Sequence, residues 1–128
     1  MANPNIVGVT CILGNTSSKV ANTTSDVFTP LVSNPALSGE VYKVNSILAA
    51  NKNVETSVDV TVLVYPEDDL GGTGNALAHA ITVPSQSTLI ILDKSTSIYL
   101  KENMSLGANA TANNSIVITT SWEEISSS

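Results

Sequence analysis

The sequence predicts an all-β protein, an antiparallel β-sandwich of jelly-roll-like or immunoglobulin-like type with an extended N-terminal segment. Three observations lead to this prediction. β-Branched and small polar residues dominate the 128 residues, whereas aromatic residues make up only 4% and charged residues 12%, and β-branched side chains suit a pleated, half-buried surface. Apolar residues recur with period two far more often than with period 3.6. Turn signals follow one another at intervals of roughly 8–12 residues, as they do in sandwiches and barrels.

The clearest strand covers residues 56–65. Val58, Val60, Val62 and Val64 alternate with more polar residues and so fall on one face of the strand. Because side chains of a strand point to opposite faces in turn, this face is expected to be wholly apolar and buried. Pro66 then ends the strand, since proline cannot donate to a central β-ladder.

Further strands follow from the same pattern. In residues 41–49 the odd-numbered positions are predicted to lie on the face opposite to the even-numbered ones. Residues 76–83, 87–92, 98–100 and 105–112 form the next candidates, separated by turns at 84–85, 93–96 and 101–103. The last strand, residues 115–124, places Ile116, Ile118, Thr120 and Trp122 on one side. Residues 67–75, which are acidic and rich in glycine, read as a hairpin or a longer connection.

The first forty residues follow the pattern less well. Residues 1–40 are therefore interpreted as an N-terminal strand or arm with an irregular segment, and residues 41–128 as the sandwich body. Together they are expected to form a single domain. Residues 6–13 read as a strand, Gly14-Asn15 as a turn, and 17–21 as a second short strand. Between residues 22 and 40 the alternation is lost, because Pro30, Pro35 and Gly39 interrupt it. This segment is either a surface loop or an arm that completes its hydrogen bonds on a neighbouring subunit, since an unpaired strand edge can template another chain.

Charge and cysteine content narrow the function classes. The net charge is −6 and the five lysines are scattered, so no basic stripe is present to neutralise phosphates, and neither nucleic acid nor an anionic membrane is an expected partner. Cys11 is the single cysteine, which excludes an internal disulfide and is read as a buried, inert thiol. No secretory signal pattern and no membrane-spanning apolar run is visible, so synthesis in a host cytoplasm is expected.

No residue set predicts catalysis, and no catalytic, cofactor-binding or metal-binding residue is assigned. His79 is the only histidine, and a catalytic triad would require it as the base, whereas its strand-like surroundings favour an ordinary strand residue. The adjacent acids Glu67, Asp68 and Asp69 lack the ligand spacing of a calcium loop and read as a solvated turn.

Three other features have a plainer reading than a functional one. The glycines of residues 71–74 are not followed by the lysine and helix of a phosphate loop, so backbone flexibility explains them. Glu123 and Glu124 point to opposite faces of a strand and do not form an acid–base pair. Trp122 is either a core anchor or a sugar-stacking residue, and the scarcity of other aromatic residues favours the core.

Four stretches resemble small virion structural proteins of tailed phages, particularly marine ones. They are residues 38–47 (SGEVYKVNSI), 83–94 (VPSQSTLIILDK), 98–102 (IYLKE) and 121–125 (SWEEI), in this order along the chain. The resemblance covers residues 38 to 125. It implies a non-enzymatic β-sandwich subunit in the virion, most of all a capsid decoration or cement protein that bridges subunits of the major capsid protein. It also implies a homo-oligomer, with a trimer favoured. A neck or tail structural protein and a carbohydrate-binding or host-adhesion module are the alternatives.

Overall fold

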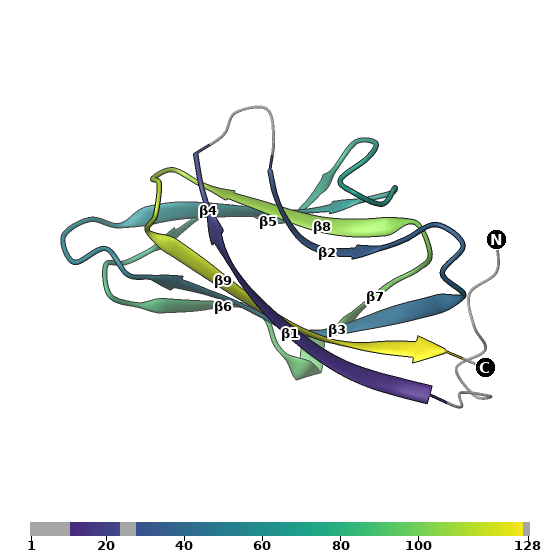
Figure 1. Ribbon diagram of the computed structural model, residues 1–128. Coiled ribbons are helices and arrows are strands. Elements are labelled where there is room, and N and C mark those ends of the chain that lie inside the picture. The colour runs from purple at the N-terminus through teal and green to yellow at the C-terminus, as the bar shows by residue number, and fades with distance from the viewer. Residues whose placement is uncertain (1–10, 24–27, 127–128) are drawn as a thin grey trace.

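Two antiparallel sheets pack face to face in the computed structural model, which describes residues 11–23 and 28–126 (Figure 1). The first sheet has the order β1 (Cys11–Ala21), β9 (Ile116–Ser126), β3 (Glu40–Asn51) and β6 (Thr88–Leu92), and β7 (Ile98–Leu100) also pairs with β3. The second has the order β2 (Thr29–Asn34), β8 (Met104–Ala110), β4 (Val58–Tyr65) and β5 (Asn75–Val83). A short 3-10 turn, η2 (Lys94–Thr96), links β6 to β7. The predicted all-β antiparallel sandwich is confirmed.

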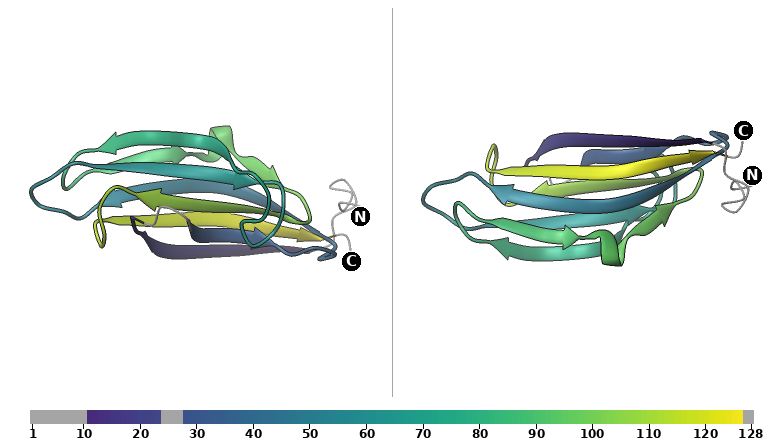
Figure 2. Two further views of the ribbon diagram at one scale, coloured as in Figure 1. Left: turned by 90° about the horizontal axis from the view of Figure 1, so that it is seen from above. Right: turned by 90° about the horizontal axis from the view of Figure 1, so that it is seen from below.

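The strand order decides between the two types of sandwich that the sequence left open. In an immunoglobulin fold the first two strands pair within one sheet. Here β1 and β2 lie in different sheets, and the chain crosses between sheets again from β2 to β3 and from β3 to β4. With the short β7 set aside, eight strands wind through two four-stranded sheets as in a jelly roll. The right-hand view of Figure 2 looks onto the first sheet from below, with β1 at one rim and β6 at the other.

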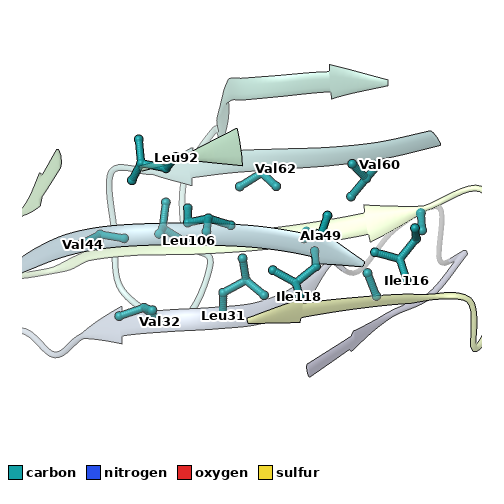
Figure 3. Packing of buried hydrophobic residues seen from close by; sticks show 14 of the residues in the cluster. Leu31, Val32, Val44, Ala49, Val60, Val62, Leu92, Leu106, Ile116 and Ile118 are labelled. Atoms are coloured by element: carbon teal, nitrogen blue, oxygen red, sulfur yellow. The ribbon is translucent and has the colours of Figure 1, made fainter. Parts of the chain in front are cut away.

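The space between the sheets is filled by aliphatic side chains from nearly every strand. Figure 3 shows Val44 and Ile118 of one sheet facing Val62 and Leu106 of the other. The large side chains that are fully buried are Ile47, Leu100, Leu106, Ile116, Ile118, Val44, Val58, Val60, Val62 and Val83. Burial of apolar surface is the main driving force of folding, at roughly 25 cal/mol per Å², so this layer holds the two sheets together.

The alternation predicted for β4 and β9 is confirmed over most of each strand. Val58, Val60 and Val62 are buried in β4, and Ile116, Ile118 and Thr120 in β9. The other predicted strands from residue 41 onward lie within two residues of the observed bounds. One difference is Tyr65, which is buried although it lies on the opposite face of β4 from Val62. The connection after β4 covers it there.

The faces predicted for β3 are wrong in part, because the strand contains a β-bulge. Its pairing with β9 shifts between Val44 and Ser46, so Asn45 has no directly opposed residue. Side chains before the bulge face the core at even positions, such as Val44, and after it at odd positions, such as Ile47 and Ala49. An extra residue in one strand reverses which positions face inward beyond it.

The N-terminal part differs more from the prediction. β1 runs without interruption from Cys11 to Ala21, and its register with β9 has no shift, so the predicted turn at Gly14-Asn15 is wrong. Thr29–Asn34 forms β2, a full strand paired with β8, where the sequence predicted lost alternation. Of the strand predicted for residues 6–13, positions 6–10 lie outside the described residues. The described part of residues 1–40 thus supplies one edge strand to each sheet.

Candidate functional site

The outer edge of β1 is an open strand edge of the first sheet. We call this the β1 edge, meaning the side of Cys11–Ala21 that does not pair with β9. Within residues 11–23 and 28–126, no strand pairs with this side. Ile12 and Leu13 each keep 54% of their surface exposed although they belong to opposite faces of the strand. The edge therefore offers both unpaired peptide groups and apolar side chains to another chain.

A polar cluster lies beside the N-terminal half of β1. Glu124 of β9 is paired with both Leu13 and Tyr42 in register. Its carboxylate accepts hydrogen bonds from the Asn15 side-chain amide at 2.6 Å and from the Trp122 indole nitrogen at 3.2 Å. Charge-assisted bonds of this kind are stronger than neutral ones, so β1 and β9 are linked by side chains as well as by their ladder.

Two carboxyl groups and a phenol influence one another in this cluster. Burial, and after it the charge of Glu124, raises the pKa of Glu40 above its ordinary value. Burial also raises the pKa of Tyr42 to about 12, with smaller contributions from Glu124 and Glu40. The sequence gives no signal of this pair, unlike the adjacent Glu123 and Glu124, because Glu40 and Glu124 approach each other across neighbouring strands. The result is a negatively charged end of the first sheet.

The acidic glycine-rich connection is a built structure and not merely a solvated turn. Asp68 accepts a hydrogen bond from the Ala36 amide at 3.2 Å, and the amides of Asp69 and Leu70 donate to the hydroxyls of Ser33 and Ser105, both at 2.9 Å. Gly72 has a φ of +78°, which glycine adopts without strain. The Asp68 carboxylate and the amides of Asp69 and Leu70 thus hold this loop against neighbouring segments.

That same loop explains why Tyr65 is buried. A Cβ added at Gly107 would lie 2.9 Å from Leu70 and 3.2 Å from the Tyr65 ring, and the ring of Phe28 stands edge-on to Tyr65 at 6.5 Å. Leu70 therefore packs onto the outer face of the second sheet, where β8 has no side chain at Gly107. The loop thus covers the outer face of the second sheet around Tyr65 and Gly107.

Two buried asparagines were not singled out by the sequence analysis. Asn34 is fully buried; its amide donates to the backbone carbonyls of Glu40 and Leu100, and its oxygen accepts from the Ser38 hydroxyl at 2.6 Å. Asn51 likewise donates to the carbonyls of Thr56 and Val83. Because buried polar groups need partners, each asparagine fixes three chain segments where a strand ends. The sequence contains many asparagines, so nothing in it distinguishes Asn34 and Asn51 from those in exposed turns.

The remaining candidates do not come together. His79 is exposed on β5. Cys11 is exposed where a buried thiol was expected, so that expectation is wrong. Trp122 packs against the hydrophobic core, as the core-anchor interpretation predicts. In the described ranges no three His, Cys, Asp or Glu residues gather closely enough to hold a metal ion. The same ranges contain no helix with the length and hydropathy that a bilayer span requires.

Comparison with known proteins gives a fold and no family. No protein-family model matches the sequence, and no curated protein matches it. Among solved structures, the chain is similar to one from Bacillus endospore appendages, described as a novel family of disulfide-linked pili. The identity is 14% and the TM-score 0.51, over 98% of this chain and 93% of that one. It is also similar to a chain of infectious bursal disease virus, Gx strain, at 10% identity and a TM-score of 0.50.

The viral match covers 91% of this chain and 33% of the viral one, so the present chain spans about a third of the viral chain's length. At such identities the likeness is one of fold, and a fold of this kind carries many functions.

Proposed function

We propose that the protein is a non-enzymatic structural subunit of a tailed-phage virion. Its favoured place is the head, as a decoration or cement protein bound to the major capsid protein. The resemblance of residues 38–125 to small virion proteins supports the phage origin, and the jelly roll, a fold used by viral capsid domains, supports the structural role. Similarity to a viral chain and to an appendage chain supports assembly at the same coarse level.

The observation that carries the proposal is the combination of a closed core with an open strand edge. An aliphatic layer fills the space between the sheets, and the β1 edge offers backbone and apolar surface to another protein chain, a second copy of the subunit included. A cement protein stabilises a head through many modest interfaces, which the symmetry of the head multiplies. The net charge of −6 and the low share of charged residues, 12%, favour contacts with protein over contacts with nucleic acid.

The proposal is tested on particles that lack the chain. Mutant heads are heated beside wild-type heads, and release of packaged DNA is followed with a dye that cannot enter intact particles. The expected result is release at a lower temperature, restored to the wild-type value when purified protein is added back. Mutant heads that release DNA at the wild-type temperature would show the cement role to be wrong. An image of the particle with this chain at the neck or tail would support the alternative placement.

A further inference from the structure

The four rims of the two sheets differ sharply in how well they could accept another strand. In the first sheet β1 forms one rim, and β6 with the three-residue β7 forms the other; in the second sheet the rims are β2 and β5. An unprotected edge strand invites pairing with other chains, and proteins block such edges with proline, bulges or short strands. Only one of the four lacks such a block.

Three edges carry a device that hinders pairing. β2 has Pro30, which cannot donate a hydrogen bond, and its register with β8 shifts just after it. β5 has two register shifts against β4, and Ala80 within it has a φ of 49°. β6 is five residues long, and its register with β3 shifts between Ile47 and Leu48, opposite Ile91. Each interrupts the straight row of peptide groups that a new strand would need.

The β1 edge is the exception. Its strand is 11 residues long, contains no proline and pairs with β9 in one continuous register. Regular pairing on one side keeps the peptide groups on the other side in a straight row. Since the other three rims are blocked, the strand of a second copy that can pair with β1 is β1 itself.

We infer that two copies of this chain associate through antiparallel pairing of β1 with β1 about a two-fold axis at Thr16. A two-fold contact is self-complementary and requires one surface only. With the axis at Thr16, all eleven residues of the strand are paired. Cys11 of one copy lies opposite Ala21 of the other, and Thr16 lies opposite Thr16. In this register odd-numbered residues lie opposite odd-numbered ones, and even opposite even. Directly opposed side chains therefore point to the same face, as a continuous sheet requires.

The side chains that meet in this register are complementary. Ile12 of one copy lies opposite Val20 of the other on the outer face, and this apolar pair occurs twice by symmetry. Leu13 lies opposite Lys19, whose aliphatic stem covers it. The apolar surface of Ile12 and Leu13, 54% exposed in one copy, becomes the contact.

Charge also fits this register. Leu13 is paired with Glu124 on its β9 side, so the Lys19 opposite Leu13 comes within two strand spacings of Glu124, about 10 Å between Cα atoms. The lysine and glutamate side chains together span that distance and point to the same face. Lys19 of each copy thereby meets the negatively charged end of the other, formed by Glu124 and Glu40. Such complementarity selects the register as well as the partner.

One added strand pair is smaller than a standard interface, so the dimer is expected to be weak in solution. The test is sedimentation equilibrium of the full chain from about 10 μM to about 1 mM, with a reductant present because Cys11 is exposed. Thr16→Lys places two like charges opposite each other and should raise the dimer dissociation constant roughly fivefold or more, as should Thr16→Glu. An equal mixture of the two variants should restore dimerisation, because Lys then faces Glu.

Thr88→Lys is the matched control. Thr88 is an exposed threonine on β6, the opposite rim of the same sheet, and its substitution should leave the dissociation constant unchanged. A wild-type chain that stays monomeric throughout the range would overturn the inference. A trimer would also overturn it, because a ring of three needs contacts between unlike surfaces. So would a dimer weakened by Thr88→Lys and not by Thr16→Lys, because its contact would lie at β6. Thermal unfolding of each variant confirms that it is folded.

Oxidative cross-linking tests the register independently. In a Cys11→Ser background, Thr16→Cys faces its own copy at about 5 Å between Cα atoms, inside the range that a disulfide spans. Ser18 lies opposite Gly14 in this register, so the Cα atoms of the two copies of residue 18 are four residues, or about 13 Å, apart along the strand. Ser18→Cys should therefore not cross-link. Equal cross-linking of both variants would refute the Thr16 axis. These experiments use no particle, so a failed dimer and a failed virion role are separate outcomes.

Discussion

Thr120 offers a substitution that should stabilise the protein. It lies on β9, is fully buried, and faces Ile47 of β3 on one side and Ser17 of β1 on the other. Its hydroxyl oxygen is buried without a hydrogen-bond partner, and so is that of Ser17. A hydroxyl in this position has lost its contacts with water and gained none in return.

The expected gain follows from that loss. A buried polar group without a partner destabilises the folded state by about 1–3 kcal/mol. Thr120→Val replaces the hydroxyl by a methyl group of similar size and keeps the β-branched shape that suits a strand. The core should neither open nor become overpacked, so the free energy of unfolding should rise by about 1–2 kcal/mol.

The neighbouring residue provides the control. Thr119 points to the outer face of β9, and its hydroxyl lies 2.9 Å from that of Ser18 in a hydrogen bond. Thr119→Val removes a satisfied group and should give no gain, and a loss of up to about 1 kcal/mol. The same substitution at two adjacent residues is thus expected to have opposite signs.

Urea unfolding followed by the fluorescence of Trp122, the only tryptophan, measures both variants. The protein is kept dilute so that it unfolds as a monomer, and an unchanged m-value shows that the two-state analysis holds. If Thr120→Val lowers the free energy of unfolding by 1 kcal/mol or more, the hydroxyl has a partner such as an ordered water, and the reasoning is wrong.

Three further predictions concern the polar groups at strand ends. Asn34→Ala should lower the free energy of unfolding by about 2–4 kcal/mol in the same assay, because two buried carbonyls lose their donor, whereas Asn75→Ala on exposed β5 should change it little. Glu124→Gln should lower the pKa of Tyr42 from about 12, since it removes a negative charge that disfavours the phenolate, and NMR of the labelled tyrosine ring measures this. The raised pKa of Glu40 means that the unfolded state loses its proton first, so wild-type stability should fall as pH rises past 4.5. Glu40→Gln should remove that part of the pH dependence, and identical pH profiles for the two proteins would contradict the assignment.

Local alternation predicted the strands whose two faces differ most clearly. Val58, Val60 and Val62 in β4 all face the core, and the less buried residues between them point to the other face. A period of two is therefore visible without any knowledge of the partner strand. The same holds for Ile116 and Ile118 in β9. These strands lie in the middle of the sheets, where burial selects the pattern most strongly.

The errors arose where pairing, and not the local sequence, decides the structure. Gly14-Asn15 is a turn signal by composition, yet in β1 it pairs with Glu123 and Trp122 of β9. Pro30 argues against a central strand but is compatible with an edge strand such as β2. The bulge at Asn45 and the approach of Glu40 to Glu124 depend on β9, which lies at the other end of the chain. No spacing within one segment encodes them.

The distribution of edge devices also disfavours open-ended pairing between copies of this chain. Each sheet has four alternating strands, so copies stacked in one orientation could pair β1 of one with β6 of the next and grow without limit. A head-to-tail contact of this kind does not close on itself unless its rotation forms a ring. The bulge and shortness of β6 disfavour it, together with the bulges and Ala80 in β5. The inferred pairing of β1 with itself uses the only regular edge among the described strands and ends after two copies. For the particle subunit proposed above, such closure would satisfy this edge in solution without producing filaments.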